Sequence, residues 1–136
     1  MYLSFLRDDD MKTLSFVLTA LLALSPLALA ADKDPFLGTF QVTGTSPGVE
    51  GKYEGTLTIT KQGSVYNLSW TIGQGGTYEG VGLMVSDQLS AAYWTPDRTS
   101  FGVVVYKAGP DGSLSGVWTP QGETRIGTEK GTRQKS

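Results

Sequence analysis

A strand–turn–strand pattern recurs three times along this chain, and each copy ends in a Trp-Thr pair. The three Trp residues are Trp70, Trp94 and Trp118, so the spacing is 24 residues each time. Seven residues before each Trp stands a residue typical of tight turns: Gly63, Asp87 and Asp111. A short turn of this kind between two strand-like segments is the signature of a β-hairpin. The repeat therefore predicts three consecutive hairpins.

The residues on either side of these turns set the expected strands. The first hairpin pairs residues 52–61 with 64–72, the second pairs 77–85 with 88–94, and the third pairs 100–108 with 113–119. A leading strand at 36–43 and a closing strand at 123–131 complete a set of eight.

Alternation along these segments indicates antiparallel strands with one face toward water. In the first hairpin Tyr53, Leu57 and Ile59 share one face, and the residues between them are mostly Thr and Glu. All 18 Gly follow residue 37, and such a load disfavours helices, where each Gly costs about 1 kcal/mol relative to Ala. The fold class expected is all-β.

Short connections favour closure of the eight strands into one antiparallel up-and-down barrel of the calycin or avidin kind, because closure removes exposed strand edges. The alternative is a small β-sandwich. A sandwich needs longer crossover connections, and only residues 43–51 are long enough for one.

Residues 11–30 have the features of a secretory signal peptide. Lys12 gives a positive start, an apolar run follows, and Ala28-Leu29-Ala30 is the small-x-small pattern that signal peptidase cleaves. Three Asp before Met11 fit poorly, so Met11 is the expected start, and a longer leader is the alternative. Residues 31–136 are then a single domain of a periplasmic or secreted bacterial protein, with a polar tail at 129–136 expected to fray.

The residue types present exclude several kinds of chemistry. The chain has no His and no Cys, which removes the common general base, the thiol nucleophile and the usual zinc ligands. Residues 31–136 have nine basic and ten acidic side chains, so no partner nucleic acid is expected, and no segment there is apolar enough to span a membrane. We expect no metal or cofactor and no enzymatic activity. The carboxylates that remain for a hydrolase are interpreted as solvated groups on strand exteriors: Glu50, Glu54, Glu79, Glu123 and Glu129.

The three Trp end alternate strands that run in the same direction, so the barrel is expected to gather them at one end. Trp70, Trp94 and Trp118, with Tyr53 and Tyr66, are the candidate ligand-binding residues. Small residues two positions before two of the Trp, Ala92 and Gly116, leave room beneath the rings. The rings either pack as a plug that closes the barrel, grip a small apolar or aromatic ligand, or face outward toward a protein. The polar turns at 95–99 and 120–122 are expected at the same end.

Several motifs resemble a group of small exported bacterial proteins, mostly uncharacterised and sometimes labelled fibronectin-binding. They are Gly38-Thr39-Phe40, Tyr53-Glu54-Gly55, Tyr66-x-Leu68-x-Trp70, Gly80-Val81-Gly82, the run from Asp111 to Trp118, and Gly127-Thr128-Glu129. The resemblance implies an exported binding protein, which takes either a small ligand or an extracellular or envelope protein. A structural envelope protein is a further alternative.

Overall fold

The computed structural model describes residues 33–135, and the predicted leader at 1–30 lies outside the described residues. Eight strands make up the fold, and they are β1 Gly38–Thr45, β2 Tyr53–Gln62, β3 Val65–Ile72, β4 Thr77–Val85, β5 Gln88–Trp94, β6 Phe101–Ala108, β7 Leu114–Pro120 and β8 Gly127–Arg133. In this part of the chain there is no helix long and apolar enough to cross a membrane.

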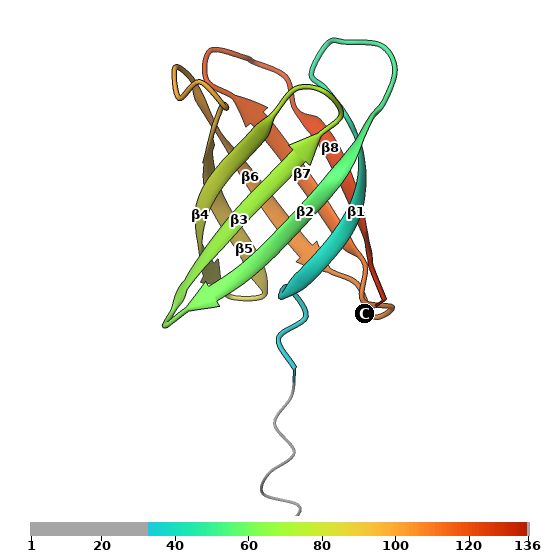
Figure 1. Cartoon of the computed structure of the whole chain (residues 1–136), viewed down its shortest axis with the longest axis vertical. Coiled ribbons are helices and arrows are strands. Elements are labelled where there is room, and N and C mark those ends of the chain that lie inside the picture. Colours follow the sequence, from blue (N-terminus) through green and yellow to red (C-terminus); the bar gives the residue numbers. More distant parts are fainter. Residues whose placement is uncertain (1–32, 136) are drawn as a thin grey trace, which may run out of the picture. The chain divides into compact units, whose positions relative to one another are not determined.

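The strands close into one barrel (Figure 1). Each strand pairs antiparallel with the next, and β8 returns to pair with β1, from Phe40↔Arg133 to Thr45↔Thr128. This pairing leaves no strand with a free edge. The predicted eight-stranded up-and-down barrel is confirmed, and the alternative β-sandwich is wrong because the β1–β8 ladder joins the two ends of a single sheet.

The connections divide the barrel into two different ends. The loop end carries the longer connections, residues 46–52, 73–76, 95–100 and 121–126, which lie at the top in Figure 1. The opposite, plugged end carries the connections 63–64, 86–87 and 109–113. The first two of these are two-residue turns that begin at Gly63 (φ 61°) and Ser86 (φ 56°), the positive φ that tight hairpin turns require.

A short segment before β1 closes the plugged end. Phe36 lies inside with 3% of its surface exposed. Its backbone N–H donates to the Asp34 carboxylate at 3.0 Å, and the same carboxylate accepts the Tyr66 hydroxyl at 2.5 Å. The Arg133 guanidinium donates to the carbonyls of Pro35, at 2.6 Å, and Leu37, and its carbon lies 4.6 Å from the centre of the Phe40 ring. Residues 34–37 are hereafter called the plug.

Inward-facing glycines make room for the large rings of the interior. An added Cβ at Gly116 would lie 2.6 Å from the Tyr106 ring, and one at Gly102 would lie 2.3 Å from the Tyr93 hydroxyl. Each of these glycines is the direct cross-strand partner of the ring that covers it, Tyr106↔Gly116 and Tyr93↔Gly102. The same pairing joins Gly44 with Tyr53 and Gly127 with Trp118. Such pairs fix the strand register because the ring fits only opposite a residue without a side chain.

Strand positions agree with the prediction to within two residues except at the C-terminus, and the leading strand predicted at 36–43 is observed at 38–45. β4 and β5 have the predicted bounds, whereas the closing strand begins at Gly127 and not at residue 123. The expected fraying of 129–136 is wrong for residues 129–133, which belong to β8 and pair with β1. The inward residues of β8 are Gly127, Glu129 and Gly131, so the strand lacks the apolar alternation by which the others were recognised.

Candidate functional site

A cavity of about 350 Å³ lies in the loop-end half of the barrel. Strand residues form its walls, and residues of the connections bring it to the rim. The lining consists of Ser46, Tyr53, Trp70, Ile72, Tyr78, Tyr93, Thr95, Ser100, Phe101, Val104, Tyr106, Trp118, Pro120 and Glu129. The other half of the barrel is filled by apolar side chains, among them Phe40, Leu57, Ile59, Leu89 and Leu114, each at most 1% exposed. A pocket this size is within the range of small-molecule sites.

Three of the five predicted site residues line this cavity: Tyr53, Trp70 and Trp118. Trp70 is buried, with 5% of its surface exposed, and Trp118 is half-buried beside the rim. The two polar connections expected at this end also reach the cavity, through Thr95 and Pro120. The prediction that aromatic residues from alternate strands meet at one end therefore holds for β3 and β7.

The prediction is wrong for Trp94, which lies on the outer surface with 36% of its area exposed. On β5 the inward residue near the loop end is Tyr93. Gly63 and Ser86 are the first residues of their turns, and both have a positive φ. Trp70 follows Gly63 by seven residues, whereas Trp94 follows Ser86 by eight. A shift of one residue moves a strand side chain to the opposite face.

The prediction that Tyr66 belongs to the ligand-binding site is also wrong. It faces the interior, but at the plugged end, where it bonds to Asp34 and lies under the Lys61 ammonium at 5.1 Å from the ring centre. The expected room beneath the Trp rings is absent as well. The space over Gly116 is occupied by Tyr106, and Ala92 lies outside the cavity lining.

Glu129, on β8, is the chemically distinctive residue of the cavity. Only 5% of its surface is exposed. One carboxylate oxygen, Oε1, accepts the Tyr53 hydroxyl at 2.8 Å. The other, Oε2, accepts the Tyr106 hydroxyl and the indole N–H of Trp70 at 3.3 Å. The Trp70 N–H also donates to the Tyr106 hydroxyl oxygen at 2.9 Å. The interpretation of this carboxylate as a solvated exterior group is therefore wrong.

Burial raises the pKa of Glu129 above its ordinary value of 4.5, because the charged form loses hydration. The hydrogen bonds from Tyr106, Tyr53 and Trp70 lower the pKa, but they offset only part of the effect of burial. The tyrosine pKa values also rise. For Tyr93 burial raises the pKa to about 12. Burial, followed by the nearby Glu129 charge, also raises the pKa of Tyr53 and Tyr106. These hydroxyls are neutral donors at physiological pH.

The aromatic rings of the cavity stand edge to face. Trp118 contacts Tyr53 at 6.1 Å between ring centres and Tyr93 at 6.3 Å, with interplanar angles of 71° and 74°. Trp70 and Tyr78 meet Tyr93 at 6.0 and 6.3 Å. Rings at such steep angles enclose a space on several sides, and edge-to-face contacts of this kind are favourable.

The indole N–H of Trp118 is buried and has no hydrogen-bond partner among the described residues. Buried Trp N–H groups usually find an acceptor, and leaving one without costs about 1–3 kcal/mol. The nitrogen lies over Gly127, where an added Cβ would stand 2.7 Å from it, so this edge of the indole is packed against the neighbouring strand.

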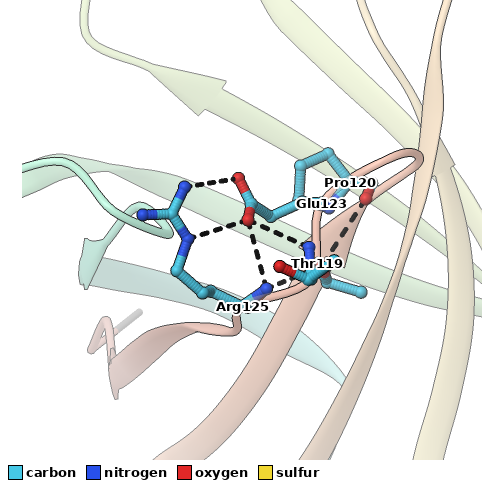
Figure 2. A network of polar contacts seen from close by, with 5 residues as sticks. Thr119, Pro120, Glu123 and Arg125 are labelled. Carbon is cyan, nitrogen blue, oxygen red and sulfur yellow. Dashed lines mark hydrogen bonds and ion pairs between the residues drawn. The ribbon is translucent and has the colours of Figure 1, made fainter.

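The rim beside Trp118 is held by a compact network in the β7–β8 connection (Figure 2). The Glu123 carboxylate accepts two bonds from the Arg125 guanidinium, from Nε at 2.9 Å and Nη2 at 3.1 Å, and two more from the backbone N–H groups of Thr124 and Arg125. Thr119 donates to the Arg125 carbonyl at 2.9 Å. These bonds lower the pKa of Glu123 to about 2, the side chain of Arg125 making the largest contribution. The Arg125 guanidinium also lies against Gly48 in the β1–β2 connection, so two rim loops meet there.

The other carboxylates considered for hydrolysis do not converge. Glu54 is exposed, and Glu79 lies outside the barrel in an ion pair with Arg98 at 2.8 Å. Within residues 33–135 no three acidic side chains are placed to hold a metal ion together.

No family model and no curated protein matches the chain. Solved structures do match in fold. A de novo designed fluorescence-activating β-barrel has a TM-score of 0.55 at 16% identity, with 73% of this chain and 94% of that chain covered. The protein EF1p2_mFAP2b bound to DFHBI gives 0.51 at 14%, covering 74% and 94%. A variant of the fluorescent protein UnaG gives 0.50 at 13%, covering 75% and 98%. These likenesses support the barrel architecture.

Proposed function

We propose that this protein binds a small, ring-bearing or apolar molecule in the loop-end cavity. The observation that carries the proposal is the cavity itself, about 350 Å³ of space walled by aromatic rings with a buried carboxylate. Mostly apolar walls with a few placed polar groups are the usual composition of ligand sites. Of the three interpretations left open by the sequence, this geometry favours rings that hold a ligand over rings packed to close the barrel.

The barrels of similar fold support this choice. One is a designed barrel that activates fluorescence, and another is described in complex with DFHBI. An eight-stranded barrel has an interior just wide enough for packed side chains or for one small ligand. Here packed side chains fill the plugged half, and the cavity occupies the other.

We propose binding and not catalysis. Glycoside hydrolysis uses two carboxyl groups on either side of the bond. Of the residues that line the cavity, Glu129 alone supplies a carboxylate, and Glu54 and Glu79 lie on the exterior.

The test is a titration with the neutral dye N-phenyl-1-naphthylamine, whose emission rises in apolar surroundings. We expect saturable binding to one site, with energy transfer from Trp70 and Trp118. The Ser100→Trp variant places a bulky ring at the rim, at a side chain that makes no hydrogen bond in the described part of the chain. It is expected to block the dye while the barrel stays folded by circular dichroism.

Trp94→Phe is the matched control, because Trp94 lies outside the barrel. It is expected to bind the dye as the unmodified protein does. Dye binding that is absent, or that survives Ser100→Trp unchanged, would contradict the proposed site.

We also propose that binding takes place in the periplasm or outside the cell, as the pattern of residues 11–30 indicates. Sequencing the N-terminus of the protein recovered from the periplasm or medium tests this. A first residue of Ala31 is the expected result, and an uncut cytoplasmic chain would contradict it.

A second candidate function is protein binding on the outer surface of β4–β7. Apolar residues gather there on the outer face, where Ala92 of β5 lies between Val81 and Val103, Ser90 lies between Leu83 and Val105, and Val105 pairs with Val117. Leu83 is 56% and Val103 50% exposed. Patches of this kind mark protein contacts. If the implied fibronectin binding is correct, purified fibronectin binds saturably, a Leu83→Thr/Val103→Thr variant binds it more weakly, and Ser100→Trp binds it normally. Equal binding by all three proteins would exclude this face.

A further inference from the structure

A buried charge without a counter-charge is the feature of the cavity that a neutral apolar ligand leaves unexplained. Glu129 is the one carboxylic acid among the described lining residues, and the lining includes no Lys or Arg. The ion pairs found in residues 33–135 involve Asp34, Glu79 and Glu123, and not this carboxylate. Buried charges in proteins are normally paired, since loss of hydration is costly.

The three donors that reach Glu129 are all neutral. Tyr53, Tyr106 and Trp70 supply hydrogen bonds but no positive charge. Oε1 accepts a single bond, from Tyr53, so it can accept another. A positively charged group in the cavity would compensate the carboxylate where the protein itself does not.

The walls suit such a group. Trp118, Tyr53 and Tyr93 contact one another at steep interplanar angles, and aromatic walls of this kind bind organic cations through the negative faces of their rings. A metal ion is a poor fit, because calcium takes six to eight oxygen ligands and the cavity offers a single carboxylate.

We propose that the ligand is an organic cation, an ammonium compound with an apolar or aromatic body, held by Glu129 within the aromatic walls. This inference rests on the proposed small-molecule function and defines its ligand class. The ammonium group faces the carboxylate, and the body fills the cavity.

The experiment compares two compounds of almost the same shape, (3-hydroxyphenyl)trimethylammonium and 3-tert-butylphenol, in displacing N-phenyl-1-naphthylamine. Both carry a ring and a hydroxyl, and only the first carries a charge. We expect the cation to displace the dye at a concentration lower by about tenfold or more, as a desolvated cation–aromatic contact with a carboxylate predicts. The anion 3-hydroxybenzoate is expected to displace it least.

Glu129→Gln keeps the side-chain shape and removes the charge. It is expected to reduce the cation-to-phenol preference to near equality without weakening the phenol. Glu79→Gln, which changes an exterior carboxylate, is the matched control and is expected to retain the full preference.

A pH series on the unmodified protein gives a readout that does not depend on a variant. The cation's charge is permanent, so its preference is expected to fall as Glu129 is protonated. The other titratable groups that face Glu129 are tyrosines, and they remain neutral while Glu129 titrates because their pKa values are raised. They are Tyr53 from β2, Tyr93 from β5 and Tyr106 from β6.

The outcomes separate the two proposals. Dye that binds while both compounds displace it equally, or a preference that survives Glu129→Gln and low pH, overturns the cation inference and leaves small-molecule binding in place. Dye that does not bind the cavity overturns the proposed function and the inference with it.

Discussion

At the scale of single residues, the site depends on groups whose surroundings differ from what their residue type suggests. Glu129 is flanked in sequence by Thr128 and Lys130, and a polar run near the C-terminus reads as a solvated tail. Its burial follows from the alternation of β8, which turns it into the barrel opposite Gly116, and the Tyr106 ring that covers this glycine brings its hydroxyl to the carboxylate. Sequence patterns built on apolar residues cannot identify a buried acid. The alternation of Gly127, Glu129 and Gly131 was the one available signal.

The two cavity Trp residues are expected to differ in their contribution to stability. Trp70 is 5% exposed and bonded to Tyr106 and Glu129, so Trp70→Ala is expected to lower the free energy of unfolding by about 3–5 kcal/mol. Trp118 lines the mouth, so Trp118→Ala is expected to cost about 1–2 kcal/mol, mainly through its ring contacts. Urea denaturation of the two variants measures the difference. Equal losses of stability would indicate that Trp118 is packed in the core and does not line an open cavity.

Glu129 also predicts an unusual dependence of stability on pH. Its folded-state pKa is raised above 4.5, so above that pH the unfolded chain loses its proton before the folded one does. The free energy of unfolding is therefore expected to fall as pH rises from 4.5 to the folded pKa, and then to level off. Denaturation between about pH 5 and pH 8 measures this, and Glu129→Gln is expected to remove the slope.

Other side chains do not obscure this effect. The chain has no His. Asp97, Asp111 and Glu123 have lowered pKa values, so their contribution to stability is present above their unfolded pKa values and is lost only as pH falls through the lowered ones. If the free energy of unfolding of the unmodified protein did not fall above pH 4.5 relative to that of Glu129→Gln, Glu129 would not be desolvated as the structure indicates.

At the scale of elements, the sequence predicts the positions of strands and turns well, but it predicts less well which residues of a strand point into the barrel. Turn residues and alternation located eight strands and placed the bounds of β4 and β5 correctly. The facing of β5 failed because the Trp repeat keeps its 24-residue spacing while the turn at Ser86 shifts the phase by one residue. Tyr93 therefore takes the inward place that the repeat gave to Trp94. The need to remove free strand edges predicts that β8 closes the barrel. The first residue of β8 was predicted incorrectly because the strand has a polar sequence without apolar alternation.

The glycine–aromatic pairs between strands give a prediction at this scale. Gly116→Ala places a Cβ 2.6 Å from the buried Tyr106 ring, so the variant is expected to lose about 1–3 kcal/mol of stability and to disturb the bonds of Tyr106 to Glu129. Gly131→Ala is the control, since its nearest neighbours lie at 3.3 Å or more and its φ is not positive. Thermal unfolding compares the two, and similar Tm values would contradict the role assigned to the pair.

At the scale of the whole molecule, the residues that close and stabilise the barrel lie at one end, and the residues that line the cavity lie at the other. The plug, Tyr66 and Arg133 close one end, and none of these residues lines the cavity at the other. The rim is fixed by surface contacts such as that between Glu123 and Arg125, whereas the plugged end is tied by Arg133 to the carbonyls of Pro35 and Leu37. A change at either end is therefore expected to affect one property and not the other.

Two arginine substitutions test this separation. Arg133→Ala removes the bonds to the plug and the contact with Phe40, so it is expected to lower the free energy of unfolding by about 2 kcal/mol with dye affinity unchanged. Arg125→Ala breaks an exposed ion pair and is expected to leave the free energy of unfolding nearly unchanged, because solvent screens such pairs. It frees the rim loop beside Trp118, however, so the dye is expected to bind more weakly. Urea denaturation and dye titration of both variants supply the measurements. If Arg133→Ala weakened the dye as much as Arg125→Ala, the two ends would be coupled through the barrel wall and the cavity would depend on the plug.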